Sequence, residues 1–403
     1  MTNDILTTDV AIVGAGLVGV SAALALHQLG FSVVLVDSKD PAQMGSIDMG
    51  SIDDVWDARI YAISPKNAAW LKSLGVWQRL KPARIGEMQA MEIFGDNNQA
   101  PITLLASDTN VDNLGFIVEA KALLQALLAQ AKTLGIRTLF NSPCLAVKTT
   151  ANKATLRFAN NKTLESSLLL AADGSHSWVR QQLNIPMQQK SYEQTAVVAN
   201  FKVEKPHSNI ARQWFTANEA KGSAILAWLP LPDNTISIVW SVPTQLADSL
   251  LMLSEDEFTQ QVQKAGNGVL GKLECIGSAV AFPLNLQKTD CLVHDCVVLV
   301  GDAAHQFHPM AGQGVNLGFR DIIDLVEILN QKNQYQTIND SGLLKQYART
   351  RKADFLSMLM LTDGLYYLFE SNNRLVKELR HWGLAAAKHQ SIKKILLEKA
   401  IAL

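Results

Sequence analysis

An apolar strand that leads directly into a glycine-rich turn constrains the fold of this chain more than any other feature. Residues 9–13 (DVAIV) predict a buried parallel strand, and residues 31–36 (FSVVLV) predict the next one, which ends at Asp37. The turn and helix between them contain glycines in the spacing GxGxxG, at Gly14, Gly16 and Gly19. Glycines there permit a tight turn, the approach of a pyrophosphate and close packing of helix on strand. We predict a Rossmann-like dinucleotide site with Asp37 near a ribose hydroxyl; the alternative is a glycine turn that serves packing alone.

A second block lies far along the chain, at residues 301–321 (GDAAHQFHPMAGQGVNLGFRD). Gly301 and Asp302 follow the apolar run 296–300 (CVVLV), and a loop of small residues then opens into a helix. The amides at a helix N-terminus attract negative charge. This block therefore predicts a seat for a cofactor.

A third apolar strand, within residues 168–180 (LLLAADGSHSWVR), ends at Asp173 and Gly174. Behind it, Ser177 and Arg180 place a hydroxyl and a guanidinium one turn apart at the start of a helix, which suits a polar ligand. Two alternatives stay open, because Asp-Gly is also a common turn dipeptide and Arg180 fits the surface of a helix.

Composition excludes several classes of function. The chain has 403 residues, which suggests more than one domain, and its formal net charge of -1 gives no basic field for nucleic acid. The four cysteines form no CxxC pair, the start MTNDILTTDV lacks a basic and then apolar signal region, and no long apolar run predicts a membrane span. A cytoplasmic location is expected. His305 and His308 are three residues apart, but no third ligand has metal-like spacing, so we predict no metal.

Together, the three blocks resemble the FAD-dependent aromatic hydroxylases that include para-hydroxybenzoate hydroxylase. Asp173 and Gly174, with Ser177 and Arg180, are similar to the DGxxSxxR motif of that family. The second block is similar to its GD-x-P-GxGxN motif, through Gly301, Asp302, Pro309, Gly312, Gly314 and Asn316. Within the family, the resemblance is greatest to the ubiquinone-biosynthesis hydroxylases of the UbiH, UbiF and VisC type. It is carried by residues 56–77, 114–127, 211–215, 228–231, 311–321 and 369–384.

The resemblance implies a role for each motif residue in binding FAD. Gly14, Gly16, Gly19 and Asp37 would hold the ADP half, and Arg59 would lie near the pyrophosphate or the flavin. Asp302 would accept a ribityl hydroxyl, and Asp173, Gly301 and Pro309 belong to the same cofactor-binding set. The amides from Gly312 through Gly314 and Val315 to Asn316 would face the pyrimidine edge of the flavin; alternatively, the Asn316 side chain is a helix N-cap. Relatives commonly carry a polar side chain where this chain has Ala120, so a flavin contact from that side chain is absent or moved.

The chemistry that the resemblance implies depends on the cofactor, and no catalytic protein nucleophile is predicted. NAD(P)H, docking transiently, would reduce FAD, and O2 would form a flavin C4a-hydroperoxide that hydroxylates a polyprenyl phenol or quinol of ubiquinone biosynthesis. The alternatives are a flavin monooxygenase that acts on another small aromatic, a flavin enzyme of another reaction, and a FAD-binding, non-catalytic partner subunit of a quinone-biosynthesis complex.

The substrate wall is predicted in the middle of the chain. Residues 197–203, 223–231, 236–242 and 278–284 have the alternating pattern of an antiparallel sheet. The pocket candidates are Phe282, Pro283, Pro309 and Trp228, although aromatic residues in a sheet are more often simply core.

The expected fold class is α/β, with a Rossmann-like FAD-binding domain built on a parallel sheet, an interleaved antiparallel-sheet substrate domain and a C-terminal helical region. The expected boundaries are 1–82, 109–182 and 290–341 for the first, 83–108 and 183–289 for the second, and 342–403 for the third. Between residues 374 and 399, basic side chains outnumber acidic ones. This end is expected to be a solvated helix face, a surface for a partner, or a peripheral contact with the inner face of the membrane.

Overall fold

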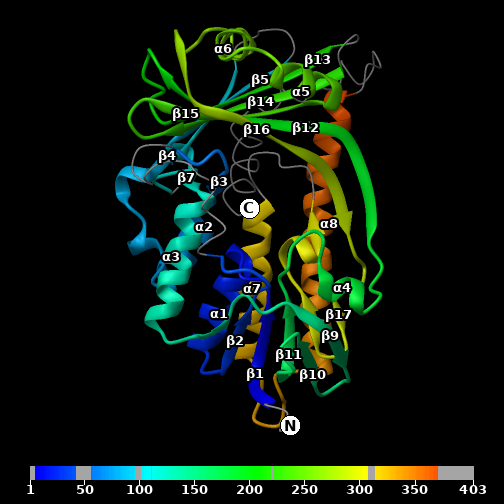
Figure 1. Ribbon diagram of the computed structural model, residues 1–403. Helices are drawn as coiled ribbons and strands as arrows, with labels where there is room; N and C mark the ends of the chain where they lie inside the picture. Colours follow the sequence, from blue (N-terminus) through cyan, green and yellow to red (C-terminus); the bar gives the residue numbers. More distant parts are fainter. Residues whose placement is uncertain are drawn as a thin grey trace.

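A computed structural model describes residues 5–41, 56–95, 101–109, 111–218, 222–306 and 314–370, with the backbone alone for 361–370. Two large sheets dominate the molecule, one above the other in Figure 1. The predicted combination of a parallel sheet, an antiparallel sheet and a helical end is confirmed.

The lower sheet carries the glycine-rich turn. Its path is β17-β18-β11-β1-β2-β8, and the strands from β18 to β8 are all parallel. The bounds are β1 (Ile5–Val13), β2 (Val33–Val36), β8 (Arg137–Leu139), β11 (Thr163–Ala171), β17 (Val293–His294) and β18 (Val297–Leu299). The antiparallel strands β9 (Cys144–Thr149) and β10 (Ala154–Phe158) extend it beyond β11. Each of the three motif blocks therefore begins at the carboxyl end of a neighbouring parallel strand, β1, β11 or β18.

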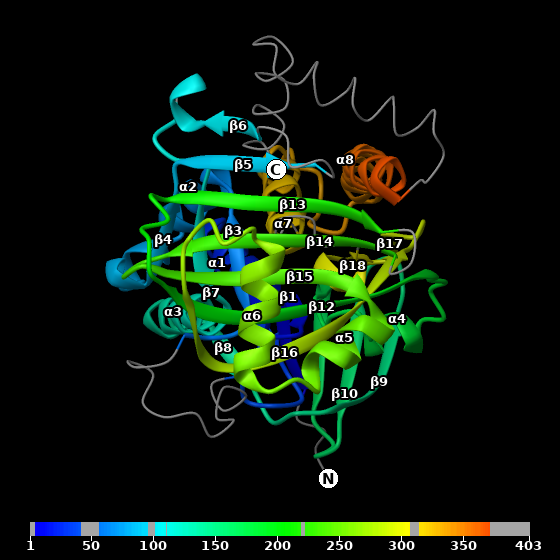
Figure 2. The same ribbon diagram turned by 90° about the horizontal axis from the view of Figure 1, so that it is seen from above.

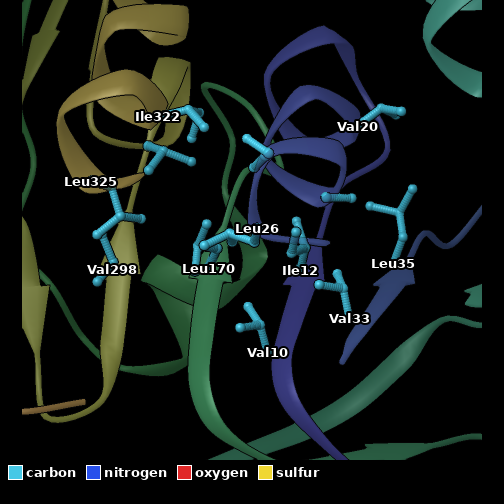
Figure 3. Packing of buried hydrophobic residues seen from close by; sticks show 14 of the residues in the cluster. Val10, Ile12, Val20, Leu26, Val33, Leu35, Leu170, Val298, Ile322 and Leu325 are labelled. Atoms are coloured by element: carbon cyan, nitrogen blue, oxygen red, sulfur yellow. The ribbon is translucent and has the colours of Figure 1, made fainter. Parts of the chain in front are cut away.

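Helices bury the apolar strands of this sheet. Figure 3 shows Val20 and Leu26 of α1 (Leu17–Gln28), and Ile322 and Leu325 of α7 (Gly314–Asn330), packed over residues of β1, β2, β11 and β18. Helix α1 is apolar nearly all round because it also contacts α3 (Ala120–Thr133) and α7. The short helix α4 (Trp178–Gln182) follows β11.

The upper sheet contains all four predicted middle strands. Its order is β19-β16-β12-β15-β14-β13-β5-β6, antiparallel except between β13 and β5. The bounds are β5 (Ala90–Phe94), β6 (Ile102–Leu105), β12 (Gln188–Val203), β13 (Ile210–Asn218), β14 (Gly222–Leu231), β15 (Thr235–Pro243), β16 (Leu273–Lys288) and β19 (His305–Gln306).

The two faces of the upper sheet have different neighbours. Its outer face is covered by α5 (Thr244–Leu251) and α6 (Glu255–Ala265), which Figure 2 shows from above. Its inner face is turned toward the lower sheet (Figure 1) and packs against residues of β3, α7 and α8. Because both faces are buried, most positions along the central strands are apolar.

A small sheet and two further helices join the layers. The sheet has the order β3-β7-β4, with β3 (Ile60–Ile63), β7 (Gly115–Glu119) and β4 (Ile85–Met88), and α2 (Pro65–Ser73) follows β3. Short turns of 3-10 helix lie at η1 (Trp77–Arg79), η2 (Pro82–Arg84), η3 (Ala106–Asp108) and η4 (Gly301–Ala303). Helix α8 (Ser341–Glu370) runs upward beside α7 and reaches β13 and β14 (Figure 1).

The predicted helical region from residue 342 begins with α8, while the basic stretch 374–399 lies outside the described residues. The domain boundaries stay predictions. No helix in the described ranges is long and apolar enough to cross a membrane.

Candidate active site

The turn after β1 contains three glycines. The packing of the protein leaves no room for a side chain at Gly14 or Gly19, whereas it leaves open space at Gly16. Gly14 has φ +105°, and a Cβ there would lie 2.3 Å from the Ala172 carbonyl oxygen. A Cβ on Gly19 would lie 1.9 Å from the Gly14 oxygen, so helix and turn pack as predicted. A Cβ on Gly16, by contrast, would meet no atom within 4 Å. Gly16 is also the N-cap of α1, and no side chain caps that helix. The open space at Gly16 therefore lies beside backbone amides of the first turn of α1 that have no side-chain partner.

Asp37 lies at the edge of the same turn. Its Oδ2 accepts a hydrogen bond from the Ala15 amide at 2.8 Å, and its Oδ1 accepts one from the Lys39 amide at 3.0 Å. Both bonds fix the carboxylate in place. Each carboxylate oxygen can accept a further bond, so the predicted contact with a ribose hydroxyl is geometrically open.

The end of β18 places Asp302 next to the first turn. Gly301 has φ +57°, and its amide donates to Asp321 Oδ2 at 2.7 Å. Asp302 itself is exposed to solvent, although the protein around it is dense. Partial desolvation raises the pKa of its carboxyl, and the nearby His305 and Arg59 act in the opposite direction. An accessible carboxylate near Arg59 suits a ligand rich in hydroxyls.

The start of α7 is fixed by the Asn316 side chain, which is 3% exposed. Its Nδ2 donates to the Ala62 oxygen at 2.7 Å, and its Oδ1 accepts from the Ser64 amide at 3.1 Å and from Asn67 Nδ2 at 2.9 Å. Asn316 therefore ties α7 to β3 and α2 and is not the N-cap of its own helix. Because the Asn316 side chain is used within the protein, the described groups of this turn that are available to a ligand are the backbone amides of Gly314, Val315 and Asn316. Pro309, Gly312 and His308 lie outside the described residues.

Arg59 meets a residue of the upper sheet. Its exposed guanidinium lies over the ring of Phe282, with 4.7 Å between the guanidinium carbon and the ring centroid. The Arg59 oxygen accepts from the Ala120 amide at 2.9 Å. The segment around Ala120 therefore contacts the Arg59 loop through its backbone.

The loop that carries Arg59 rests on a buried ion pair that the sequence did not reveal. Glu119 accepts from the Asp57 amide at 2.7 Å and from Arg84 Nε at 2.7 Å. Asp57 in turn accepts from the amides of Arg59 and Lys121, at 2.9 and 3.1 Å. Arg84 fixes Glu119, Glu119 fixes Asp57, and Asp57 fixes the backbone of Arg59.

Comparison with known proteins agrees with this arrangement. Residues 7–360 match the family model described as FAD binding domain. The chain is 31% identical to ubiquinone hydroxylase UbiL of Rhodospirillum rubrum over 98% of its length and 89% of the relative's. It is also 31% identical to 3-demethoxyubiquinol 3-hydroxylase of Escherichia coli, over 98% of this chain and 97% of that one.

The chain belongs to the FAD binding domain family. Within it, the protein is one of the FAD-dependent aromatic monooxygenases related to the ubiquinone-biosynthesis hydroxylases, and its cofactor is FAD.

Solved structures show the same fold at low sequence identity. The p-nitrophenol 4-monooxygenase PnpA of Pseudomonas putida has a TM-score of 0.75 at 17% identity, over 99% of this chain and 98% of that chain. HpxO of Klebsiella pneumoniae, in a structure with FAD, has a TM-score of 0.73 at 16% identity, over 98% of each chain.

The residues of this monooxygenase fit FAD. The open side of Gly16 and the uncapped amides of α1 leave room for a pyrophosphate, and Asp302 and Arg59 are both accessible. Among the described residues, no group of three or more His, Cys, Asp or Glu side chains could hold a metal ion. His305 instead contacts Asp321, with 2.8 Å between Nε2 and Oδ2.

The third motif is bonded to the segment that carries Asp302. Asp173 accepts from Ser177 Oγ at 2.5 Å and from the Val179 amide at 3.0 Å, so it supports the first turn of α4, whose N-cap is Ser177. Burial raises the pKa of Asp173, and the bond from Ser177 opposes that shift. Arg180 is 4% exposed and donates to the Ala303 oxygen at 2.8 Å. It is therefore neither a surface residue nor free for a ligand, because it links the third motif to the residue after Asp302.

The pocket candidates divide between the two faces of the upper sheet. Phe282 is half-buried on the inner face, beside Arg59. Pro283 pairs with Thr195, whose hydroxyl lies 3.2 Å from that of Thr244 in α5, so Pro283 belongs to the outer face. Trp228 is 1% exposed in the core beneath α6, where a Cβ on Gly266 would strike its ring. Trp228 therefore does not lie at the site. It is a core residue, which was the alternative interpretation of aromatic residues in this sheet.

A buried network of charged residues contacts the segment that carries Asp302, and no motif in the sequence indicates it. Asp321 accepts from the Gly301 amide, from His305 and, at 2.7 Å, from Arg351 Nε of α8. Burial alone would raise the pKa of Asp321, but His305, Arg351 and these hydrogen bonds hold it below its ordinary value. Arg351 also contacts Asp324 and Asp354, each at 2.6 Å. The network fixes both ends of the segment that carries Asp302, and it anchors α8 to α7.

Proposed function

We propose that this monooxygenase hydroxylates the aromatic ring of a polyprenyl phenol or quinol in ubiquinone biosynthesis, with NAD(P)H and O2 as cosubstrates. The observation that carries the proposal is the end-to-end similarity to relatives named as ubiquinone hydroxylases. In human COQ6, named a ubiquinone biosynthesis monooxygenase, 28% identity extends over 94% of this chain. Since these relatives are named as enzymes, the non-catalytic partner subunit is not favoured.

Bound FAD would supply the redox chemistry, passing electrons from NAD(P)H to O2 so that one oxygen atom enters the ring and the other becomes water. The protein holds and shields that chemistry. Gly14, Gly16, Gly19 and Asp37 bind the ADP half, and Asp302 accepts a hydroxyl of the ribityl chain. The first turn of α7 presents backbone N–H groups, whose dipole stabilises negative charge on a reduced flavin.

Phe282 and Arg59 close the side of the site that faces the upper sheet. The aromatic ring excludes water from the reacting atoms, while the guanidinium neutralises anionic groups of the cofactor. The substrate ring then lies between the flavin and the inner face of the upper sheet. A polyprenyl substrate also favours a peripheral position at the cytoplasmic face of a membrane.

Deletion of the gene, followed by mass spectrometry of the accumulated quinone intermediates, tests the proposal. A precursor that lacks one ring hydroxyl is expected to accumulate, and the wild-type gene is expected to remove it. A variant with Asp302→Asn should fail to do so. An unchanged quinone profile in the deletion strain would exclude this function.

A further inference from the structure

Gln213 is a largely buried amide with no hydrogen-bond partner among the described residues. The side chain is 7% exposed, and none of its polar atoms forms a hydrogen bond within the described ranges. Gln194, a glutamine buried to a similar degree at 5% exposed, donates to the Ser223 oxygen at 3.2 Å. Buried amides are normally paired, because an unpaired one loses its bonds to water without replacement. The amide atoms of Gln213 are not among the fully buried polar atoms that lack a partner, so they keep some accessible surface that a polar ligand can contact.

The inner face of the upper sheet is where this amide lies. Along β13, Trp214 packs in the outer core, whereas Ala211 and Phe215 belong to the clusters of the inner face. Because side chains alternate along a strand, Gln213 points to the inner face with Ala211 and Phe215. Its partners in register are Ile93 of β5 and Ala227 of β14, so its immediate surroundings are apolar.

The inner-face neighbours of Gln213 contact different parts of the FAD-binding layer. Ala211 shares an apolar cluster with Ile60 and Ala62 of β3. Phe215 shares another with Leu317, in the first turn of α7. Gln213 lies between the two clusters and faces the place where β3 meets α7, which the bond from Asn316 to Ala62 joins. That is the end of α7 at which the proposed flavin ring would lie.

We infer that Gln213 binds the ring oxygen of the aromatic substrate and so orients the ring for hydroxylation. This inference rests on the proposed function. A carboxamide can donate to a quinol or carbonyl oxygen and accept from a phenol hydroxyl, so it recognises the ring oxygen in either state. In apolar surroundings one such bond discriminates strongly, because a ligand without the oxygen leaves the amide unpaired.

The test compares Gln213→Met with wild type, since methionine is close to glutamine in shape but apolar. FAD-loaded protein is titrated without NAD(P)H with 2-farnesylphenol and with 2-farnesylanisole, whose oxygen is methylated, and binding is followed by the flavin absorbance. Wild type is expected to prefer the phenol, and Gln213→Met to lose about tenfold of that preference, equal to about 1.4 kcal/mol. Thermal unfolding of the ligand-free variant should occur at an unchanged or higher temperature, because the substitution removes no hydrogen bond among the described residues.

Gln194→Met is the matched control. It removes an amide that is hydrogen-bonded within the protein, so it should lower the unfolding temperature and leave the preference for the phenol intact. An unchanged preference in Gln213→Met, a lowered unfolding temperature, or weaker FAD retention with the preference intact would each overturn the inference. If wild type binds the phenol selectively but forms no hydroxylated product, the proposed function fails while the role of Gln213 in binding stands.

Discussion

The guanidinium of Arg59 lies over the ring of Phe282, with 4.7 Å between the guanidinium carbon and the ring centroid. Arg59 belongs to the loop before β3, and Phe282 to β16 of the upper sheet. The pair therefore joins the layer that carries the FAD-binding motifs to the upper sheet, under which we propose that the substrate binds.

Phe282→Ala should remove the contact between Arg59 and the upper sheet. An exposed cation–π contact contributes about 0.5–1 kcal/mol, so the affinity for FAD should fall about two- to fivefold. Removal of the ring should also admit water, and more of the NAD(P)H should be consumed with release of hydrogen peroxide. Equilibrium binding of FAD and the ratio of peroxide to product measure both effects. Phe282→Tyr keeps the ring and serves as control; equal behaviour of the two variants would count against the assignment.

Asp302→Asn should separate stability from cofactor binding. Since desolvation raises the pKa of Asp302 in the folded protein, ionisation of this group lowers stability as pH rises through that pKa. At neutral pH, FAD-free Asp302→Asn should therefore unfold at a temperature no lower than wild type, yet bind FAD more weakly. Asp290, an exposed carboxylate that pairs with Lys352, provides the control Asp290→Asn. Unchanged FAD affinity in Asp302→Asn would contradict the role given to this carboxylate.

Asp321→Asn should be strongly destabilising. The change leaves buried Arg351 and His305 without their carboxylate, a loss of about 3–5 kcal/mol in the free energy of unfolding. Because the pKa of Asp321 is lowered in the folded protein, its contribution is present above the ordinary Asp pKa and is lost as pH falls through the folded value. Urea unfolding should show a difference from wild type that shrinks in acid. Asp324→Asn, at the more exposed rim of the network, should cost less than about 1 kcal/mol.

Asn316→Ala should loosen the start of α7. It removes the bonds to Ala62, Ser64 and Asn67 and leaves buried groups unpaired, at a cost of about 1–3 kcal/mol. Since the amides of the first turn would no longer be held toward the flavin, FAD should also dissociate faster. Fluorescence of released flavin during dilution measures this rate. Asn333→Ala, in an exposed turn, is the control, and an identical release rate for both variants would show that Asn316 does not position the site.

Much of the fold followed from local patterns. The turn at Gly14 and the four middle strands were predicted because their signals lie within a few residues of one another. The resemblance assigned Asp302 and the first turn to one FAD site, and the parallel order of β1, β11 and β18 gives the physical reason, because the carboxyl ends of parallel strands share an edge.

The contacts missed from the sequence depend on packing between distant elements. Arg351 and Asp321 are on different helices, and no spacing indicates that α8 lies against α7. The face of Trp228 was also undetermined, because a sheet buried on both sides has apolar residues at successive positions and alternation no longer marks the inner face. Arg180 and Asn316 fit ligand-binding motifs by type, yet both side chains are used within the protein.

In the proposed function, this chain transfers one atom of O2 to an aromatic ring. Purified FAD-loaded protein is incubated with NAD(P)H, 2-farnesylphenol and O2 enriched in the heavy isotope, and the product is examined by mass spectrometry. We expect a hydroxylated ring that carries one heavy oxygen atom and is formed only when NAD(P)H is present. A product whose new oxygen comes from water, or NAD(P)H consumption that yields peroxide alone, would contradict it.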